Sequence, residues 1–452
     1  MELRLKENSK IRAKKIFILA LPAILEMSLN TMLGVADTLM ISRIIGKEGL
    51  AAVGFANQIF FTLIFIFSSF NAGATAMIAR SYGERNYKRL NKIMGQNLTL
   101  NTSIGLVVFF LTFIFAGNIL SVYDITPQVK SLGVTYLKIV AYSQLFMFIS
   151  FAMAASLRGA GDTKTPMYIT GSANILNIIG NYVLMTGFWI FPDMGIAGAA
   201  LSTTISRILA SIAYIFIVFN IKEKLQLKFE NLKLTKEILQ PLWNFSYAAG
   251  LEQLSMQLAF FLNGIIVSML TTTSEAAFRI LINIESISFM PAIGTSIATA
   301  TLVGKHLGEN RPEESLKTGF TAAGMGVIWG LFMGIIFLLF PEPIIRIFTT
   351  ETVVVEASLK TLRIAGINQA PLAFMIIMAG ALRGTGDTKG VMIITAMRLW
   401  LMFVPLTYLF TILLQQGVTG VWYAEISSFV VFSFVIFKRF KAMEWTEIRM
   451  FA

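Results

Sequence analysis

The sequence contains no cysteine and only one histidine in its 452 residues. Disulfide bonds, thiolate metal sites and cysteine nucleophiles are therefore excluded, and thiols cannot report the redox compartment. The single histidine, His306, lies in the polar stretch from Gly304 to Gly308, where we expect a solvated loop residue and no metal ligand or catalytic base. HExxH and GxSxG motifs are also missing, so we expect that the protein is not an enzyme.

Charge is scarce as well. Charged residues make up 14% of the chain, against 56% hydrophobic residues and a mean hydropathy of +0.71. No water-soluble core of this size requires so much apolar surface, so lipid must cover part of it. Acidic residues are outnumbered, with 25 Asp and Glu against 37 Lys and Arg. Because no basic domain with interleaved aromatics lies outside the apolar segments, membrane topology explains this excess better than nucleic-acid binding.

Twelve apolar segments reach the length that a bilayer requires, and the need to satisfy backbone groups in lipid predicts helices. They cover residues 16–41, 51–79, 92–122, 131–156, 166–190, 195–220, 243–270, 275–303, 317–347, 357–382, 390–414 and 417–438. The first is too long for a signal-peptide core and should remain as a span. Basic loops alternate with loops poor in cations, which places both termini in the cytoplasm.

An eight-residue motif occurs twice at a spacing of about 225 positions, as LRGAGDTK from Leu157 and as LRGTGDTK from Leu382, with seven identities. Glu26 and Glu252 repeat at nearly the same spacing. Each copy of the repeat holds an even number of spans, so the two copies should run parallel. Rocking between two such lobes would expose a central cavity to either side in turn.

The predicted fold is therefore an all-α integral membrane protein. Its twelve transmembrane helices form two pseudo-symmetric six-helix bundles around a central cavity. We predict an N-terminal lobe at residues 1–220, a lysine-rich cytoplasmic linker at 221–240 and a C-terminal lobe at 241–452.

One carboxylate, Asp37, interrupts the first apolar segment, where an ionised aspartate costs about 2.5 to 3.5 kcal/mol on insertion scales. Burial disfavours its charged form and a nearby cation favours it, so Asp37 is a candidate for carrying a proton or binding an ion. The fifth segment supplies Asn177 and Asn181, which are four residues apart and share a helix face, and the sixth supplies Thr203. These oxygens suit a proton network or Na⁺, while ordinary hydrogen bonding between helices is the alternative.

The second half of the chain has Asn263 at the position that matches Asp37, so we expect ion coupling to be concentrated in the N-terminal lobe. Other carboxylates lie in or near the spans, namely Glu26, Glu252 and Glu285, the last six residues after Arg279. They either form buried ion pairs with a structural role or line the substrate cavity. Pro22 removes a backbone hydrogen bond from the first helix, as a static kink or as a hinge.

The chain resembles the multidrug and toxic compound extrusion (MATE) family over nearly its full length. The resemblance rests on Leu-Pro-Ala-Ile-Leu-Glu at residues 21–26, Val-Ala-Asp-Thr at 35–38, the duplicated motif and the layout of six plus six spans. The pattern is closest to the DinF-like branch. In that branch the helix-one aspartate matches Asp37, the bending proline matches Pro22, and the polar partners match Asn177, Asn181 and Thr203.

The resemblance implies efflux of amphipathic organic cations or zwitterions in exchange for H⁺ or Na⁺, without a prosthetic cofactor. It also implies that Asn30 and Arg207 face the N-lobe cavity, although Arg207 is equally suited to pair with a buried acid. Many relatives have aspartate in place of Asn181. With one carboxylate fewer, a bound Na⁺ loses charge compensation, which favours protonation of Asp37 slightly.

The NorM-like branch is associated with acids in helices seven and ten, whereas helix ten here offers only Asn368 and Gln369, which argues against an ion site in the C-terminal lobe. The main alternative function is a lipid-linked oligosaccharide flippase of the same broader superfamily. A flippase would favour several cations in the cavity, and Arg207 is the main candidate. We expect a protein that works as a monomer in the cytoplasmic membrane of a prokaryote.

Overall fold

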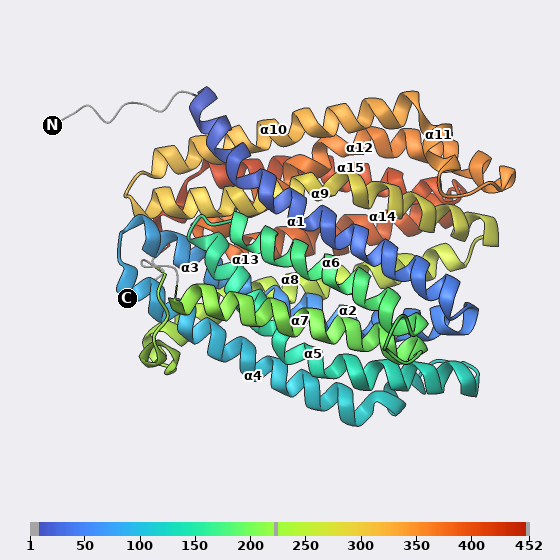
Figure 1. Ribbon diagram of the computed structural model, residues 1–452. Helices are drawn as coiled ribbons and strands as arrows, with labels where there is room; N and C mark the ends of the chain where they lie inside the picture. The colour runs from blue at the N-terminus through green and yellow to red at the C-terminus, as the bar shows by residue number, and fades with distance from the viewer. Residues whose placement is uncertain (1–8, 221–224, 449–452) are drawn as a thin grey trace. The chain divides into compact units, whose positions relative to one another are not determined.

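The computed structural model describes residues 9–220 and 225–448, and each of the twelve predicted spans is helical in it (Figure 1). The first six are α1 (Ser9–Ile44), α2 (Lys47–Ser68) with α3 (Asn71–Gly83), α4 (Tyr87–Leu120), α5 (Pro127–Gly159), α6 (Lys164–Thr186) and α7 (Gly195–Asn220). The next four are α8 (Lys236–Ser268), α9 (Thr272–Gly308), α10 (Pro312–Leu339) and α12 (Thr352–Thr385).

The eleventh span changes its helix type along its length. It consists of α13 (Thr388–Met397), the π-helical η2 (Arg398–Phe403), α14 (Val404–Tyr408) and the π-helical η3 (Leu409–Leu413). The twelfth span is α15 (Thr419–Lys441), and the short elements are η1 (Phe229–Leu232), α11 (Pro341–Arg346) and η4 (Glu444–Glu447). π-helical turns inside α-helices are often found at functional sites.

Among the residues that the structure describes, ten helices are long and apolar enough to cross a membrane. The other two predicted spans are α2 with α3, which are separated at Ser69 and Phe70, and α6. Three asparagines lower the hydropathy of α6, namely Asn174, Asn177 and Asn181. Large apolar side chains stay exposed along the helices, such as Val107, Phe110 and Ile114 on α4, as expected of surfaces that lipid covers.

The duplicated motif builds the same corner between helices in both halves. Gly161 and Gly386 have φ values of +87° and +95°, a left-handed conformation that glycine adopts without strain. Asp162 then accepts a hydrogen bond from the backbone N–H of Thr165 at 3.0 Å, and Asp387 accepts one from Gly390 at 3.0 Å. Asp387 is thus the N-cap residue of α13, and Asp162, one residue before the N-cap of α6, accepts a backbone N–H of that helix's first turn, which explains the Gly-Asp pair in the motif.

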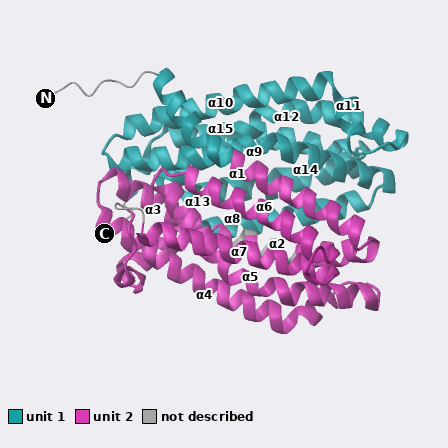
Figure 2. Cartoon of the chain, in the orientation of Figure 1, with its two compact units in different colours: residues 1–24, 247–452 teal, residues 25–246 magenta. Residues whose placement is uncertain are grey.

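Packing divides the chain into two compact units (Figure 2). We call Leu25–Ser246 the N-unit, and Met1–Ile24 together with Tyr247–Ala452 the C-unit. The helices α1 and α8 therefore each begin in one unit and end in the other. The predicted lobe boundaries follow from the sequence repeat and stay a prediction, and residues 221–224 of the predicted linker lie outside the described residues.

Each unit has its own apolar core. In the N-unit the core lies between α4, α5 and α7, around side chains such as Phe148 and Leu137. In the C-unit one cluster gathers α9, α10, α12 and α15 around Met378 and Phe440, and a second lies around Trp422. Polar side chains that are buried within such cores need hydrogen-bond partners.

Candidate functional site

Asp37, Asn177, Asn181 and Thr203 lie together inside the N-unit, although they come from α1, α6 and α7. Asn181 Nδ2 donates to Asp37 Oδ1 at 2.6 Å and to Asn177 Oδ1 at 3.3 Å. Asn177 Nδ2 donates to Thr203 Oγ1 at 3.2 Å. Asn177 and Asn181 are 2% and 1% exposed, so these contacts lie within the helix packing. The four residues are therefore neighbours as expected, and their role in ion coupling stays a prediction.

The side-chain amide of Asn177 fits its neighbours better with its nitrogen and oxygen exchanged. In that orientation Asn177 Nδ2 donates to Asp37 Oδ1 at 3.0 Å, and Asn177 Oδ1 accepts from the hydroxyl of Thr203 at 3.2 Å and from its backbone N–H at 3.1 Å. One oxygen of Asp37 then receives two amide N–H groups. Within the described part of the chain, the buried Asn181 Oδ1 has no hydrogen-bond partner.

Two glycines allow α6 and α7 to approach closely enough to form this cluster. A Cβ atom on Gly180 of α6 would lie 2.5 Å from Ser202 Oγ, and one on Gly198 of α7 would lie 2.4 Å from the carbonyl oxygen of Leu184. Ser202 Oγ also donates to the carbonyl oxygen of Asn177 at 2.8 Å. A larger residue at either glycine would push apart the helices that carry the site.

The polar contact between α1 and α6 continues two turns away from Asp37. There Asn174 Nδ2 donates to Asn30 Oδ1 at 3.2 Å, and Asn30 is exposed. Arg207 of α7 donates from Nη1 to Ser143 Oγ at 2.8 Å and is an electrostatic neighbour of Asp37. Arg207 is thus engaged with polar groups of the N-unit itself.

Glu26 and Glu252 occupy matching positions in matching clusters. Arg158 Nη1 donates to the two oxygens of Glu26 at 3.0 and 3.2 Å, and Thr170 Oγ1 donates to Glu26 Oε1 at 3.4 Å. In the C-unit, Arg383 Nη2 donates to Glu252 Oε1 at 2.7 Å, and Thr395 Oγ1 donates to the same oxygen at 3.1 Å. Both glutamates are 4% exposed. The arginine of each duplicated motif therefore holds a buried carboxylate, on α1 in one unit and on α8 in the other.

The candidate residues of the C-unit are buried but separate. Asn263 Nδ2 donates to the carbonyl oxygen of Ala259 at 2.8 Å, while Asn263 Oδ1 has no partner among the described residues. Glu285 accepts from Gln369 Nε2 and from Trp422 Nε1, each at 2.9 Å. Gln369 lies on α12, the tenth span, and carries no charge. It is thus a neutral hydrogen-bond partner of Glu285 on α9, the eighth span.

Arg279 lies apart from this cluster, because its Nη2 bonds to the exposed Glu275 at 2.9 Å. The proximity of Arg279 and Glu285 in the sequence is therefore not a guide to the partner of Glu285. Trp422 and Gln369 hold that carboxylate from α15 and α12, helices that are far from it along the chain.

Two charged residues of the C-unit were missed by the sequence reasoning, Glu425 of α15 and Arg398 at the start of η2. Arg398 donates to Ser428 Oγ at 3.2 Å and stacks 4.1 Å from the ring centre of Phe429. Arg398 is an electrostatic neighbour of Glu425, which in turn neighbours Glu285. Each is a single charge within an apolar segment, and this feature alone was sufficient to identify both as candidate functional residues.

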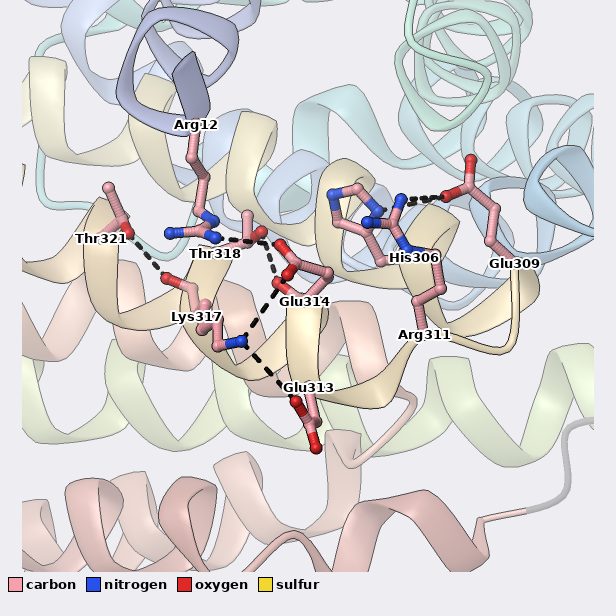
Figure 3. A network of polar contacts seen from close by, with 9 residues as sticks. All are labelled: Arg12, His306, Glu309, Arg311, Glu313, Glu314, Lys317, Thr318 and Thr321. Carbon is pink, nitrogen blue, oxygen red and sulfur yellow. Dashed lines mark hydrogen bonds and ion pairs between the residues drawn. The ribbon is translucent and has the colours of Figure 1, made fainter. Parts of the chain in front are cut away.

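His306 contradicts the expectation of a solvated loop. It lies inside α9, is 6% exposed, and its Nδ1 is 3.3 Å from Glu309 Oε2 (Figure 3). The polar stretch that contains it stays helical as far as Gly308, and the helix packs His306 into the C-unit. Within the described residues, no group of three or more His, Cys, Asp or Glu side chains could hold a metal ion.

Pro22 lies inside α1, two residues before Ile24, where the helix passes from the C-unit to the N-unit. A proline at this position removes one hydrogen bond from the helix interior. Whether α1 bends there during function stays a prediction.

These features define a class of protein. Two repeated bundles of apolar helices, with a half-buried carboxylate and buried amides inside one of them, are typical of secondary membrane transporters built from internal repeats. The family model for MatE matches the chain twice, over residues 22–183 and 248–409. The chain therefore belongs to the MatE family of membrane transporters, and each half carries one copy of the family's repeat.

Individual relatives agree over most of the chain. A probable multidrug resistance protein NorM from Thermotoga maritima is 32% identical over 447 residues, which covers 97% of this chain and 94% of the relative. The uncharacterized transporter YisQ from Bacillus subtilis is 28% identical over 442 residues, with coverage of 96% and 95%.

A solved structure of a MOP superfamily transporter from Pyrococcus furiosus superposes with a TM-score of 0.89 at 22% identity, covering 96% of this chain and 97% of that one. This likeness concerns the fold, a two-lobe arrangement of twelve transmembrane helices. The predicted fold class is thereby confirmed.

Proposed function

We propose that this protein is a secondary active multidrug efflux antiporter that exports amphipathic organic cations or zwitterions in exchange for H⁺. The observation that carries the proposal is the cluster around Asp37, a carboxylate in a membrane-spanning helix that accepts a hydrogen bond from Asn181 of a second helix, and from Asn177 when that amide is exchanged. Such residues in spans are rare and mark ion and substrate pathways. The relative from Thermotoga maritima is named a probable multidrug resistance protein, which supports the substrate class.

In this mechanism Asp37 binds a proton when the N-unit opens to the outside and releases it to the cytoplasm. The organic cation and the proton then compete for the negative charge of Asp37. The proton is therefore carried inward and the organic cation outward, never both together. The bound cation needs few fixed contacts, because methionine and aromatic side chains adapt to varied shapes. Alternating exposure of the site follows from rocking of the two repeats.

The geometry around Asp37 argues against a Na⁺ site. A sodium site needs several oxygens directed at the ion, whereas Asn181 directs its Nδ2 at Asp37, and Asn177 does so too in its better orientation. Amide N–H groups stabilise a carboxylate without an ion. For Na⁺ to bind here, both amides would have to turn their oxygens toward Asp37, and Asn181 Oδ1 is the oxygen without a partner that could then serve.

The match of Asp37 and Pro22 to the aspartate and the bending proline supports the DinF-like branch. Pro22 then serves as the hinge of α1. The alternation of basic and cation-poor loops supports both termini in the cytoplasm. We propose further that the protein lies in a cytoplasmic membrane and works as a monomer. Arg207 bonds to Ser143 and neighbours Asp37, which leaves the flippase alternative without its main candidate for a pyrophosphate site.

The test uses wild type, Asp37→Asn and a matched control, Asp124→Asn, reconstituted in liposomes. Asp124 is an exposed aspartate in the connection between α4 and α5 of the same unit. Efflux of a fluorescent cationic dye is followed under a pH gradient alone and under a Na⁺ gradient alone. We expect wild type and Asp124→Asn to move dye on the pH gradient, and Asp37→Asn to have lost this transport.

The other outcomes are equally informative. Dye movement that responds only to Na⁺ would reverse the ion assignment. Transport by Asp37→Asn at the wild-type rate would remove Asp37 from the coupling mechanism. Absence of dye movement under both gradients would contradict the antiporter proposal and favour a flippase, tested with a fluorescent lipid-linked sugar.

A further inference from the structure

The helices α5 and α12 each carry an exposed cation at the same position of the repeat. Lys138 precedes Arg158 of the duplicated motif by 20 residues, and Arg363 precedes Arg383 by 20 residues. Lys138 and Arg363 are both exposed. Among the residues that the structure describes, neither side chain has a hydrogen bond or an ion pair. The two repeats therefore share a charged position that no protein group neutralises.

Helix geometry sets the depth of these cations in the membrane. At a rise of 1.5 Å per residue, 20 residues of helix correspond to about 30 Å, the thickness of the hydrocarbon core. Within its own unit, each cation therefore lies near the membrane surface opposite to the one at which the duplicated motif forms its corner. Lysine and arginine side chains at this depth extend along the helix to place their charge among the headgroups.

Apolar side chains surround Lys138 in the N-unit, where α5 runs beside α4 (Figure 1). Lys138 Nζ lies 5.9 Å from the ring centroid of Phe113 on α4. One turn along α5, the ring of Tyr142 lies 5.6 Å from that of Phe113, and Tyr142 is 51% exposed. Phe110 and Ile114 of α4 are 55% and 63% exposed. One ammonium group is thus set in a surface of exposed aromatic and aliphatic side chains, which acyl chains are expected to cover.

The surroundings of Arg363 in the C-unit are similar. Ile367, one turn along α12, is 59% exposed. Lys360, one turn before Arg363, is exposed as well, and its Nζ lies 6.0 Å from the ring centroid of Tyr423 on α15. The acid on the same helix face, Glu356, forms no ion pair with Lys360 or Arg363 in the described part of the chain. The C-unit therefore presents two cations where the N-unit presents one.

A cation in a surface that lipid covers needs a counter-charge, because the low dielectric of its surroundings strengthens the attraction between opposite charges. At the level of the headgroups, the phosphates of phospholipids are the anions of a bilayer. Lysine and arginine both bind phosphate, and arginine can do so through two parallel hydrogen bonds. An anionic phospholipid fits better than a zwitterionic one, whose own ammonium group is repelled by the cation. Organic cations are repelled for the same reason, so this surface is unsuited to the proposed substrates.

We propose that Lys138 and Arg363 each bind the phosphate of an anionic phospholipid, one lipid in each unit. The acyl chains then lie on the exposed apolar side chains of α4 and α5 in the N-unit, and of α10 and α12 in the C-unit. The N-unit lipid is close to a contact that supports the candidate site, because Thr204, next to Thr203 on α7, donates from Oγ1 to the carbonyl oxygen of Ile139 at 3.1 Å. The inference does not depend on the coupling ion.

The test uses the full chain in phosphatidylcholine nanodiscs, with a fluorophore placed where the acyl chains of the N-unit lipid would lie. Leu106 of α4 is 40% exposed and lies two turns from Phe113 toward the membrane centre. Because the sequence contains no cysteine, Leu106→Cys can be labelled with bimane without background. A small, equal fraction of phosphatidylglycerol or of phosphatidylcholine is added with a nitroxide on its acyl chain, which quenches bimane at short range.

We expect phosphatidylglycerol to be enriched about fivefold next to the label relative to phosphatidylcholine, the effect of one cation near an anionic lipid. Lys138→Gln should lose this enrichment, and Lys138→Arg should keep it. Lys130→Gln is the matched control, because it removes the same charge from the first turn of α5, and it should keep the enrichment. Lys138 is exposed, so its substitution leaves the packing of the helices intact.

Three results would overturn the N-unit site. Equal quenching by the two lipids in wild type would mean that Lys138 selects no lipid. Equal losses in Lys138→Gln and Lys130→Gln would mean that the net charge of the protein attracts phosphatidylglycerol without a site. Quenching by neither lipid would mean that protein covers this face.

The C-unit site is measured in the same way from Leu331→Cys. Leu331 lies at the position of α10 that matches Leu106, 225 residues later, and is 54% exposed. Because Lys360 is one turn from Arg363, we expect Arg363→Gln to lower the enrichment and Arg363→Gln/Lys360→Gln to abolish it, while Arg363→Lys keeps it. Enrichment that survives the double variant would overturn the C-unit site.

Discussion

The change Asn181→Asp tests the proposed chemistry of the N-unit site directly. A carboxylate oxygen at the place of Asn181 Nδ2 would lie 2.6 Å from Asp37 Oδ1. At an effective dielectric constant of about 20, two unit charges at this separation repel by about 6 kcal/mol, an upper value because each charge spreads over two oxygens. This energy corresponds to roughly four factors of ten in an equilibrium constant. Both carboxylates cannot remain charged unless a proton or a cation lies between them.

At alkaline pH protons are scarce, so Na⁺ is the cation available to the two carboxylates. The variant also loses the N–H group of Asn181 that donates to Asp37. We therefore expect Asn181→Asp to gain dye efflux on a Na⁺ gradient at alkaline pH, where wild type shows none. Asn174→Asp is the matched control. It adds a buried carboxylate to the same helix, but next to Asn30 and two turns from Asp37, and should keep the wild-type ion dependence.

Liposomes with equal internal and external pH and an imposed Na⁺ gradient provide the assay. The reasoning would be refuted if Asn181→Asp still exported dye on a pH gradient, which shows that it is folded, yet remained indifferent to Na⁺ at alkaline pH. Equal gains by Asn181→Asp and Asn174→Asp would show that added charge alone, and not its distance from Asp37, causes the effect.

Two further predictions concern stability, measured as melting temperature in detergent. Glu314→Leu should destabilise the protein by about 3 to 5 kcal/mol because it leaves a buried ion pair broken, and the double variant Arg12→Met/Glu314→Leu should recover most of this loss. An equal loss in the double variant would contradict the assignment. Trp422→Phe keeps the aromatic ring but removes the donor to Glu285, and should cost about 1 to 3 kcal/mol; an unchanged melting temperature would mean that this bond contributes nothing.

The core of the candidate site was predictable from the sequence. Asn177 and Asn181 share a helix face because of the helical period, and Asp37 is the only acid of the first span beyond Glu26. A polar residue in lipid needs a polar neighbour, and few side chains other than these asparagines could serve as the partner of Asp37. The orientation of the two amides, on which the proposed argument against Na⁺ rests, depends on distances of a few tenths of an ångström that no pattern contains.

The partners of the C-unit acids were not predictable in the same way. Several polar residues of that half were available to Glu285, and its nearest arginine along the chain, Arg279, bonds elsewhere. Gln369 and Trp422 contact it from helices that start far from it in the sequence. The sequence did not predict the burial of His306, because a short polar stretch has the same composition whether the helix ends before it or continues through it.

The sequence by itself determined that the chain is a membrane protein, that twelve helices cross the membrane and that the two halves of the chain are repeats. Segment length, hydropathy and motif spacing are local quantities, and the bilayer leaves little freedom in using them. Only the tertiary structure decided that α1 and α8 each belong to two units, and that Arg12 meets Glu314. Those two residues are 302 positions apart, and which residues meet over such a separation depends on how all the intervening helices pack.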